Sequence, residues 1–168
     1  MRMKHTRLKG GENKSAGLGN AEVIVDCSSK EATCWLSHYH SRERMRVHEE
    51  ERNPARLVVT QTSPHDRVFA TIKRMPLLLW NREFIMRVLA TQEVETGDFL
   101  VCIQSVDEAV DYGSTFRTVR GTTTAFLRVS SLGDSQCEVV LYQYLEAGGI
   151  VPIRVENSKI PQSLSVLQ

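Results

Sequence analysis

Apolar and polar positions alternate along most of the chain after residue 55, with the period of two that is typical of β-strands. The alternating runs come in pairs, and each pair is separated by a short turn-forming sequence, SPHD, EVETG or GDSQ. Strands joined by such short turns pair with their neighbours in sequence and form an antiparallel meander. The pattern predicts three hairpins, made of residues 56–62 with 67–75, 83–92 with 98–106, and 115–132 with 137–145.

A strand and a helix are predicted ahead of this meander. Residues 21–27, AEVIVDC, are short and β-branched, which favours a strand. Ser28 and Glu31 have the spacing of a capping box, in which each side chain bonds the backbone N–H of the other residue. One apolar helix face follows, made of Ala32, Trp35, Leu36 and Tyr39. We expect the charged run at 41–56 to end this helix and lead the chain away from it.

A further helix is predicted at the C-terminus, where IPQSLSVLQ (160–168) carries Pro161 early, in a position that helices tolerate. A curved antiparallel sheet with a helix across its concave face is an α+β fold. If side chains do not fill the space between helix and sheet, that space is a ligand cavity.

Charge and composition exclude several classes of protein. The chain has 168 residues, enough for one domain, and its net charge of +1 lacks the basic excess of nucleic-acid binders. No run approaches the roughly 18 consecutive apolar residues of a membrane-spanning helix, and the N-terminus lacks the apolar core of a secretory signal. The four cysteines are too few for a disulfide framework, so we expect reduced thiols and a cytoplasmic location.

Residues 1–20 are basic, rich in glycine and almost without apolar periodicity. They predict a flexible N-terminal segment, followed by one domain at 21–168. A solvated tail is the simpler interpretation of this segment, and peripheral contact with an anionic membrane is the alternative.

Four pieces of the chain resemble START domains, the lipid-transfer modules related to the steroidogenic acute regulatory protein. Residues 81–85, NREFI, resemble the "P-R-D-F-V" signature, and residues 119–121, VRG, resemble the "V-I-R-A" strand that follows it. EAGGIVP (146–152) resembles the "D-x-G-G-x-[IV]-P" stretch of the last strand, and IPQ (160–162) matches the start of the closing helix. The resemblance covers residues 21–168 and implies the helix-grip fold, related to that of Bet v 1, with one lipid inside it.

The resemblance implies that Gly148, Gly149 and Pro152 form the hinge of a helical lid. Glycine reaches positive φ without a Cβ clash, and proline limits continuation of the strand. An ordinary Gly-Gly loop is the alternative interpretation.

The resemblance also assigns one face of each strand to the cavity, although simple core packing explains the same residues as well. On the partner strand of the signature, the set with Leu100 is favoured over the set with Val101 and Ile103, which stays plausible. The predicted ligand-binding residues are Phe84, Met86, Val88, Cys102, Gln104, Thr123 and Leu127.

The predicted ligand is a sterol-like or other weakly polar lipid. Several START domains place an arginine on the inward side a few residues after the signature aromatic, where this chain has Val88 and Ala90. Arg87 lies on the opposite side, so Gln104 and Thr123 remain to orient a hydroxyl group.

No catalytic constellation emerges from the sequence. Cys34 and His38 have i, i+4 spacing, but nothing completes a four-ligand zinc site or supplies an oxyanion hole for a Cys–His pair. We therefore expect no enzyme activity, metal or cofactor. The alternatives are a START-like module with a filled interior that binds a protein, and a hydrolase or cyclase on the same scaffold. The early START elements have no clear counterpart before Ala21, and the closing helix breaks off at Gln168, so we expect the chain to be part of a larger protein.

Overall fold

The computed structural model describes residues 2–9, 15–76, 78–149 and 151, with the backbone alone for 2–9 and 15. These residues form one nine-stranded sheet and two helices. The helices are α1 (Ser29–Ser37) and α2 (Arg42–Glu50). The strands are β1 (Arg2–Lys9), β2 (Ser15–Val25), β3 (Ala55–Ser63), β4 (Asp66–Lys73), β5 (Asn81–Gln92), β6 (Phe99–Ser105), β7 (Thr118–Arg120), β8 (Thr122–Gly133) and β9 (Gln136–Glu146).

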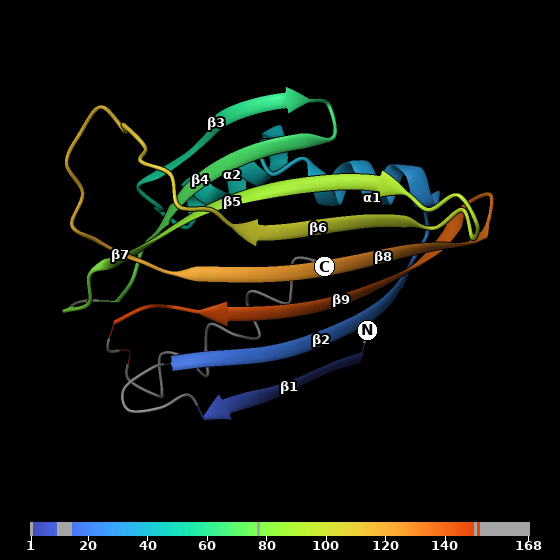
Figure 1. Cartoon of the computed structure of the whole chain (residues 1–168), viewed down its shortest axis with the longest axis horizontal. Helices are drawn as coiled ribbons and strands as arrows, with labels where there is room; N and C mark the ends of the chain where they lie inside the picture. The colour runs from blue at the N-terminus through green and yellow to red at the C-terminus, as the bar shows by residue number, and fades with distance from the viewer. Residues whose placement is uncertain (1, 10–14, 77, 150, 152–168) are drawn as a thin grey trace.

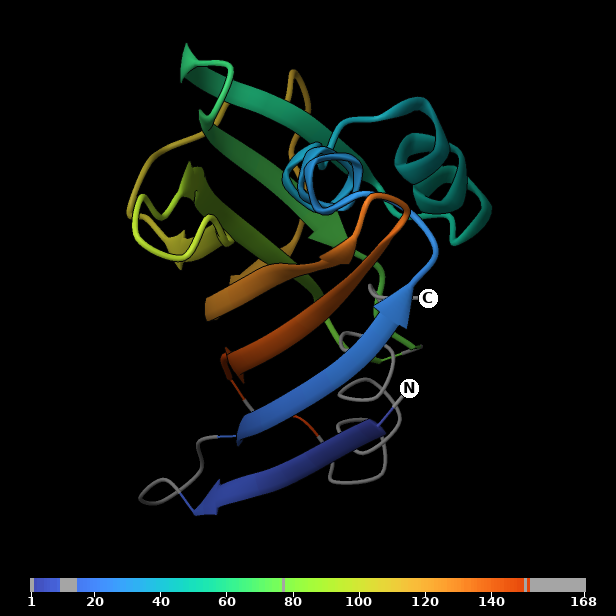
Figure 2. The ribbon, with the colours of Figure 1, turned by 90° about the vertical axis from the view of Figure 1, so that its right-hand side faces the viewer.

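The strands follow the order β1-β2-β9-β8-β6-β5-β4-β3, and all neighbours in this order are antiparallel (Figure 1). The short strand β7 lies off this path and pairs with β5 in parallel. Seen from the side, the sheet is strongly twisted and both helices lie on the same side of it (Figure 2). We call the side on which α1 packs the inner face. The α+β class, the antiparallel sheet and the three hairpins are therefore confirmed.

The N-terminal prediction was wrong at its boundary. Order begins before Ala21, because β2 starts at Ser15 and residues 2–9 form the edge strand β1. β2 pairs with β9 from Ala16, opposite Glu146, to Val25, opposite Cys137. This pairing uses backbone groups, which need no apolar periodicity, and the sequence pattern therefore could not reveal it.

The capping box of α1 is confirmed. The Glu31 carboxylate accepts from the Ser28 backbone N–H at 3.0 Å, and the Ser28 hydroxyl accepts from the Glu31 N–H at 3.3 Å. The charged run does not simply lead the chain away, because it forms the second helix, α2. Ser41 caps that helix by accepting from the Arg44 N–H at 3.4 Å, and Arg46 pairs with glutamates in the preceding and following turns.

The strand predicted at 115–132 is split at Gly121 into β7 and β8. A Cβ on Gly121 would lie 2.4 Å from the ring of Phe84, so the glycine lets the chain pass directly under that ring. The predicted C-terminal helix at 160–168 lies outside the described residues.

The sheet has a core on each face. The larger core joins Ala32 and Leu36 of α1 to the inner face of β4, β5, β6, β8 and β9. The smaller core lies on the outer face, where residues 106–112 pack over β3, β4 and β5 through Val106, Val110 and Tyr112. No helix in the described part of the chain is long and apolar enough to cross a membrane.

Candidate functional site on the inner face of the sheet

The wall of the inner face is built around β5. Its inward positions Met86 and Val88 are buried, whereas the outward positions Arg87 and Leu89 are exposed. Phe84, on the same side as Met86, is half-buried and packs against the inner core. The predicted inward side of β5 therefore coincides with the side that α1 covers, while ligand contact itself stays a prediction.

On β6 the favoured side was wrong. Cys102 and Gln104 are exposed on the outer face, and Val101 and Ile103 are the buried inward residues. The register decides this, because directly opposed residues share a face: Ile103 lies opposite Val88. Gln104 therefore cannot orient a ligand on the inner face.

On β8 the predicted residues Thr123 and Leu127 are both buried on the inner face. The Thr123 hydroxyl donates to the Tyr144 carbonyl at 3.0 Å and accepts from the Gln143 side chain at 3.3 Å. The Thr123 backbone N–H donates to the Ser105 hydroxyl at 2.8 Å. Ser105, Thr123 and Gln143 thus form a polar patch on the wall, of which the sequence predicted only Thr123.

Arg82 is a buried charged residue of the inner wall. It shares the inward side of β5 with Phe84 and Met86, and only 3% of it is exposed. Its Nη1 donates to the Trp80 carbonyl, and its Nε has no hydrogen-bonding partner among the described residues. Burial lowers the pKa of Arg82 below its ordinary value. The sequence placed this arginine on the correct side, but gave no sign that it would be buried.

Two glycines after β9 lie beside this arginine. Gly148 and Gly149 have φ of 70° and 59°, values that favour glycine over any other residue. A Cβ on Gly148 would lie 2.2 Å from the Arg120 carbonyl oxygen, and one on Gly149 would lie 3.9 Å from Nη2 of Arg82. The bend expected at EAGGIVP is present, whereas its role as a lid hinge stays a prediction and Pro152 lies outside the described residues. We call Arg82, Phe84, Gly121, Gly148 and Gly149 the glycine end of the sheet.

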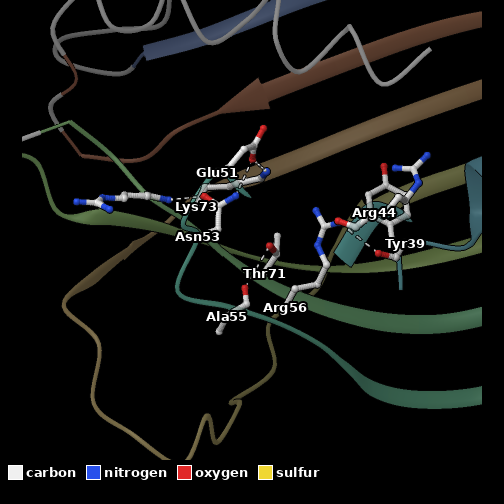
Figure 3. Close-up of polar contacts among 9 residues, drawn as sticks. Tyr39, Arg44, Glu51, Asn53, Ala55, Arg56, Thr71 and Lys73 are labelled. Carbon is white, nitrogen blue, oxygen red and sulfur yellow. Dashed lines mark hydrogen bonds and ion pairs between the residues drawn. The ribbon is translucent and has the colours of Figure 1, made fainter. Parts of the chain in front are cut away.

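A second buried cationic cluster lies where the helices meet β3 and β4, and Figure 3 shows part of it. The Arg44 guanidinium stacks on Trp35 at 5.2 Å and on Tyr39 at 4.8 Å from the ring centroids. Arg56 donates from Nη1 to the carbonyls of Tyr39 and Arg44, both at 3.3 Å. His48 is 3% exposed, and burial, together with the nearby charges of Arg56 and Lys73, lowers its pKa to about 4. We call Trp35, Tyr39, Arg44, His48 and Arg56 the helix corner.

Among the described residues, no hydrogen bond joins the Cys34 thiol to the His38 ring. Nδ1 of His38 bonds to the Cys34 carbonyl oxygen at 2.7 Å, and the Cys34 side chain is exposed on α1. Among the residues with a described position, no three of the types His, Cys, Asp and Glu gather as a metal site would require.

Comparison of the sequence with protein-family models and with curated proteins gives no match. Solved structures do match. The human StarD13 (DLC2) lipid transfer and protein localization domain has a TM-score of 0.67 at 11% identity, over 98% of this chain and 85% of that one. Human StAR-related lipid transfer protein 5 has a TM-score of 0.66 at 18% identity, over 96% of this chain and 81% of that one. The chain therefore has the START-like helix-grip fold.

The same fold also occurs in an enzyme. Norcoclaurine synthase from Thalictrum flavum, in complex with dopamine and hydroxybenzaldehyde, has a TM-score of 0.51 at 10% identity, over 95% of this chain and 89% of that one. Identities this low establish a common fold and leave function to the site itself.

Proposed function

We propose that this chain binds one hydrophobic lipid against the inner face of its sheet, for transfer or sensing. The observation that carries the proposal is the match to lipid-transfer domains over nearly the whole chain, with TM-scores of 0.66 to 0.67. The apolar wall formed by Met86, Val88 and Leu127 supports it. Burial of an apolar ligand contributes roughly 25 cal/mol per Å² removed from water, so a single lipid supplies most of its own binding energy.

The ligand class follows from the middle of the wall. Arg67 of β4 lies opposite Val88 on the same face, but Val88 and Ala90 themselves are buried and apolar, so the centre of β5 carries no charge of its own. This supports the predicted sterol-like or weakly polar lipid body, with the polar patch around Thr123 beside it. The hydroxyl of Thr123 already donates to the Tyr144 carbonyl. A ligand hydroxyl would therefore share the hydrogen-bonding groups of this patch with residues that already bond to one another.

We propose that the protein acts by binding and carries out no reaction. A pair of catalytic groups would need mutual contact, and no hydrogen bond joins the Cys34 thiol to the His38 ring in the described structure, where Nδ1 of His38 bonds to the Cys34 carbonyl oxygen. The alternative of a hydrolase or cyclase would be supported by turnover of an ester or carbonyl substrate that is lost on mutation of His38.

Membrane contact and location also belong to this proposal. Five basic residues against one acidic residue at 1–20 support peripheral contact with an anionic membrane on the cytoplasmic side. Co-sedimentation with vesicles that contain or lack phosphatidylserine tests the contact, and equal binding to both would contradict it.

The substitution Met86→Trp tests the lipid site. A larger side chain on the inner wall should reduce uptake of a fluorescent sterol about tenfold, because the added ring takes space that the lipid needs. Leu89→Trp is the matched control, since Leu89 lies on the outer side of the same strand and is 40% exposed. Native mass spectrometry of the purified protein would identify any lipid that it retains. Equal uptake by both variants would place the lipid elsewhere, and a folded wild-type protein that takes up no lipid would favour the protein-interaction module.

A further inference from the structure

Arg82 is a buried cation of the inner wall whose charge nothing in the described part of the chain neutralises. Arg67 of β4, which lies opposite Val88 on the same face, is only partly buried. Arg82 forms no ion pair with a described carboxylate, and its one hydrogen bond within this part is to the neutral carbonyl of Trp80. A buried charge without a counter-charge is costly in free energy. An anion that reaches Arg82 would supply the counter-charge that the described residues do not provide.

The free part of Arg82 is the part that recognises oxyanions. Nη1 donates to the Trp80 carbonyl, Nε has no hydrogen-bonding partner among the described residues, and Nη2 has no hydrogen bond to another of them. Nε and Nη2 together form one edge of the guanidinium. This edge presents two parallel N–H groups, the geometry that binds a carboxylate or phosphate through both of its oxygens. Gly149 faces the same edge, because a Cβ there would lie 3.9 Å from Nη2.

The position of Arg82 connects this edge to the apolar wall. Arg82, Phe84 and Met86 follow one another along the inward side of β5, so an anion at Arg82 lies in line with the proposed lipid body. Val88 and Ala90 continue the same side without charge. The inward side of β5 therefore has a buried charge at the glycine end and is apolar beyond it.

We propose that Arg82 binds the acidic group of an amphipathic lipid, a carboxylate or a phosphate monoester, whose apolar chain lies along the inner wall. This inference rests on the proposed lipid-binding function and adds an acidic head to the weakly polar body expected there. Because the arginine is already desolvated and held by Trp80, the ligand supplies the missing counter-charge without the full cost of ordering the side chain.

The test compares three probes with the same chain: palmitate, its uncharged methyl ester, and lysophosphatidate with a palmitoyl chain. Their affinities are measured by displacement of a fluorescent ester from the full chain. Hydrogen bonds to charged groups contribute enough for an expected preference of about 10- to 100-fold for the acids over the methyl ester. The tighter acid identifies the head group as carboxylate or phosphate, and either result supports the proposal.

Arg82→Met should reduce the ratio of the affinity for the acids to the affinity for the methyl ester to about one, with the affinity for the ester unchanged. The matched control is Arg87→Met, which removes the same charge from the exposed outer side of the same strand, and should keep the preference. Arg82→Lys retains the positive charge but lacks the two parallel N–H groups of the guanidinium edge, so it should keep only part of the preference for the acids. If Arg82→Met does not fold, Arg82→Lys and Arg82→Gln are compared in its place, again with loss of preference as the expected result.

Two contrary outcomes are distinguishable. If the wild-type protein binds acid and ester equally, or if the folded Arg82 variants retain the wild-type ratio, Arg82 is not the anchor and lipid binding itself still stands. If the wild-type protein binds none of the probes and no sterol, the proposed function fails, and the inference fails with it.

Discussion

The helix corner and the glycine end both bury arginines, but they accommodate the charge in different ways. At the helix corner, Arg44 lies against the faces of Trp35 and Tyr39, and Arg56 donates to two carbonyl oxygens. Tyr39 in turn packs on Phe69 of β4, with ring centroids 5.8 Å apart. At the glycine end, Arg82 has a single carbonyl acceptor and no aromatic ring stacked on it within the described residues.

The difference separates a structural role from a binding role. At the helix corner, cation–π contacts and carbonyl acceptors compensate part of the cost of burying the charges. Nε and Nη2 of Arg44 and Nε of Arg56 nevertheless have no hydrogen-bonding partner among the described residues. The Nε of Arg82 also lacks a partner in the part of the chain that the structure describes, and no described aromatic ring lies against this guanidinium to offset its charge. The same type of substitution in the two regions should therefore have different effects on stability and on ligand binding.

The largest effect is expected from Gly148→Val. The new Cβ would lie 2.2 Å from the Arg120 carbonyl oxygen, and the residue would keep a φ of 70°. Backbone strain and overpacking together should reduce the free energy of unfolding by about 2–4 kcal/mol. If Gly148 is part of a lid hinge, exchange of a fluorescent lipid should also slow.

Gly97→Val is the control for Gly148→Val, because Gly97 has a similar φ of 77° and a Cβ added there would meet no atom within 4 Å. Gly97→Val should lower the free energy of unfolding by about 1 kcal/mol, from backbone strain alone, as measured by urea titration. Equal losses of unfolding free energy in the two variants would mean that the close approach of Gly148 to Arg120 of β7 does not hold the glycine end in place.

The sequence predicted most of the fold, since alternation and turn residues defined the hairpins. It could not decide the inward side of β6, because Leu100 and Cys102 are as apolar as Val101 and Ile103, and only the register with β5 separates them. It also missed α2, whose residues are nearly all polar and show no strong apolar face. The burial of Arg82 depends on chain segments distant in sequence, which no local pattern reports.

The next effect in size is a pH dependence that originates at the helix corner. The pKa of His48 falls from 6.5 to about 4 on folding, because burial and the charges of Arg56 and Lys73 disfavour protonation more than Glu51 favours it. Since the folded pKa lies below the unfolded one, stability is complete above about pH 6.5 and falls as the pH decreases toward 4. The loss across this range should be about 1–3 kcal/mol.

His48→Leu should remove this part of the pH dependence, as measured by urea unfolding at a series of pH values. His65→Leu is the control, because His65 lies exposed in the turn between β3 and β4. An unchanged pH profile in His48→Leu would show that the imidazole is not kept neutral by its position in the helix corner.

The smallest effect is the most direct test of the comparison, because it makes the same change in both regions. Arg44→Met should lower the free energy of unfolding by about 1 kcal/mol, since it removes the cation that stacks on two aromatic rings. Arg82→Met should leave stability unchanged or raise it, because an apolar side chain of similar length replaces an unneutralised buried charge. Urea unfolding of the ligand-free proteins measures both. A greater loss for Arg82→Met would show that Arg82 stabilises the fold, and would contradict the proposal that an acidic ligand supplies its missing counter-charge.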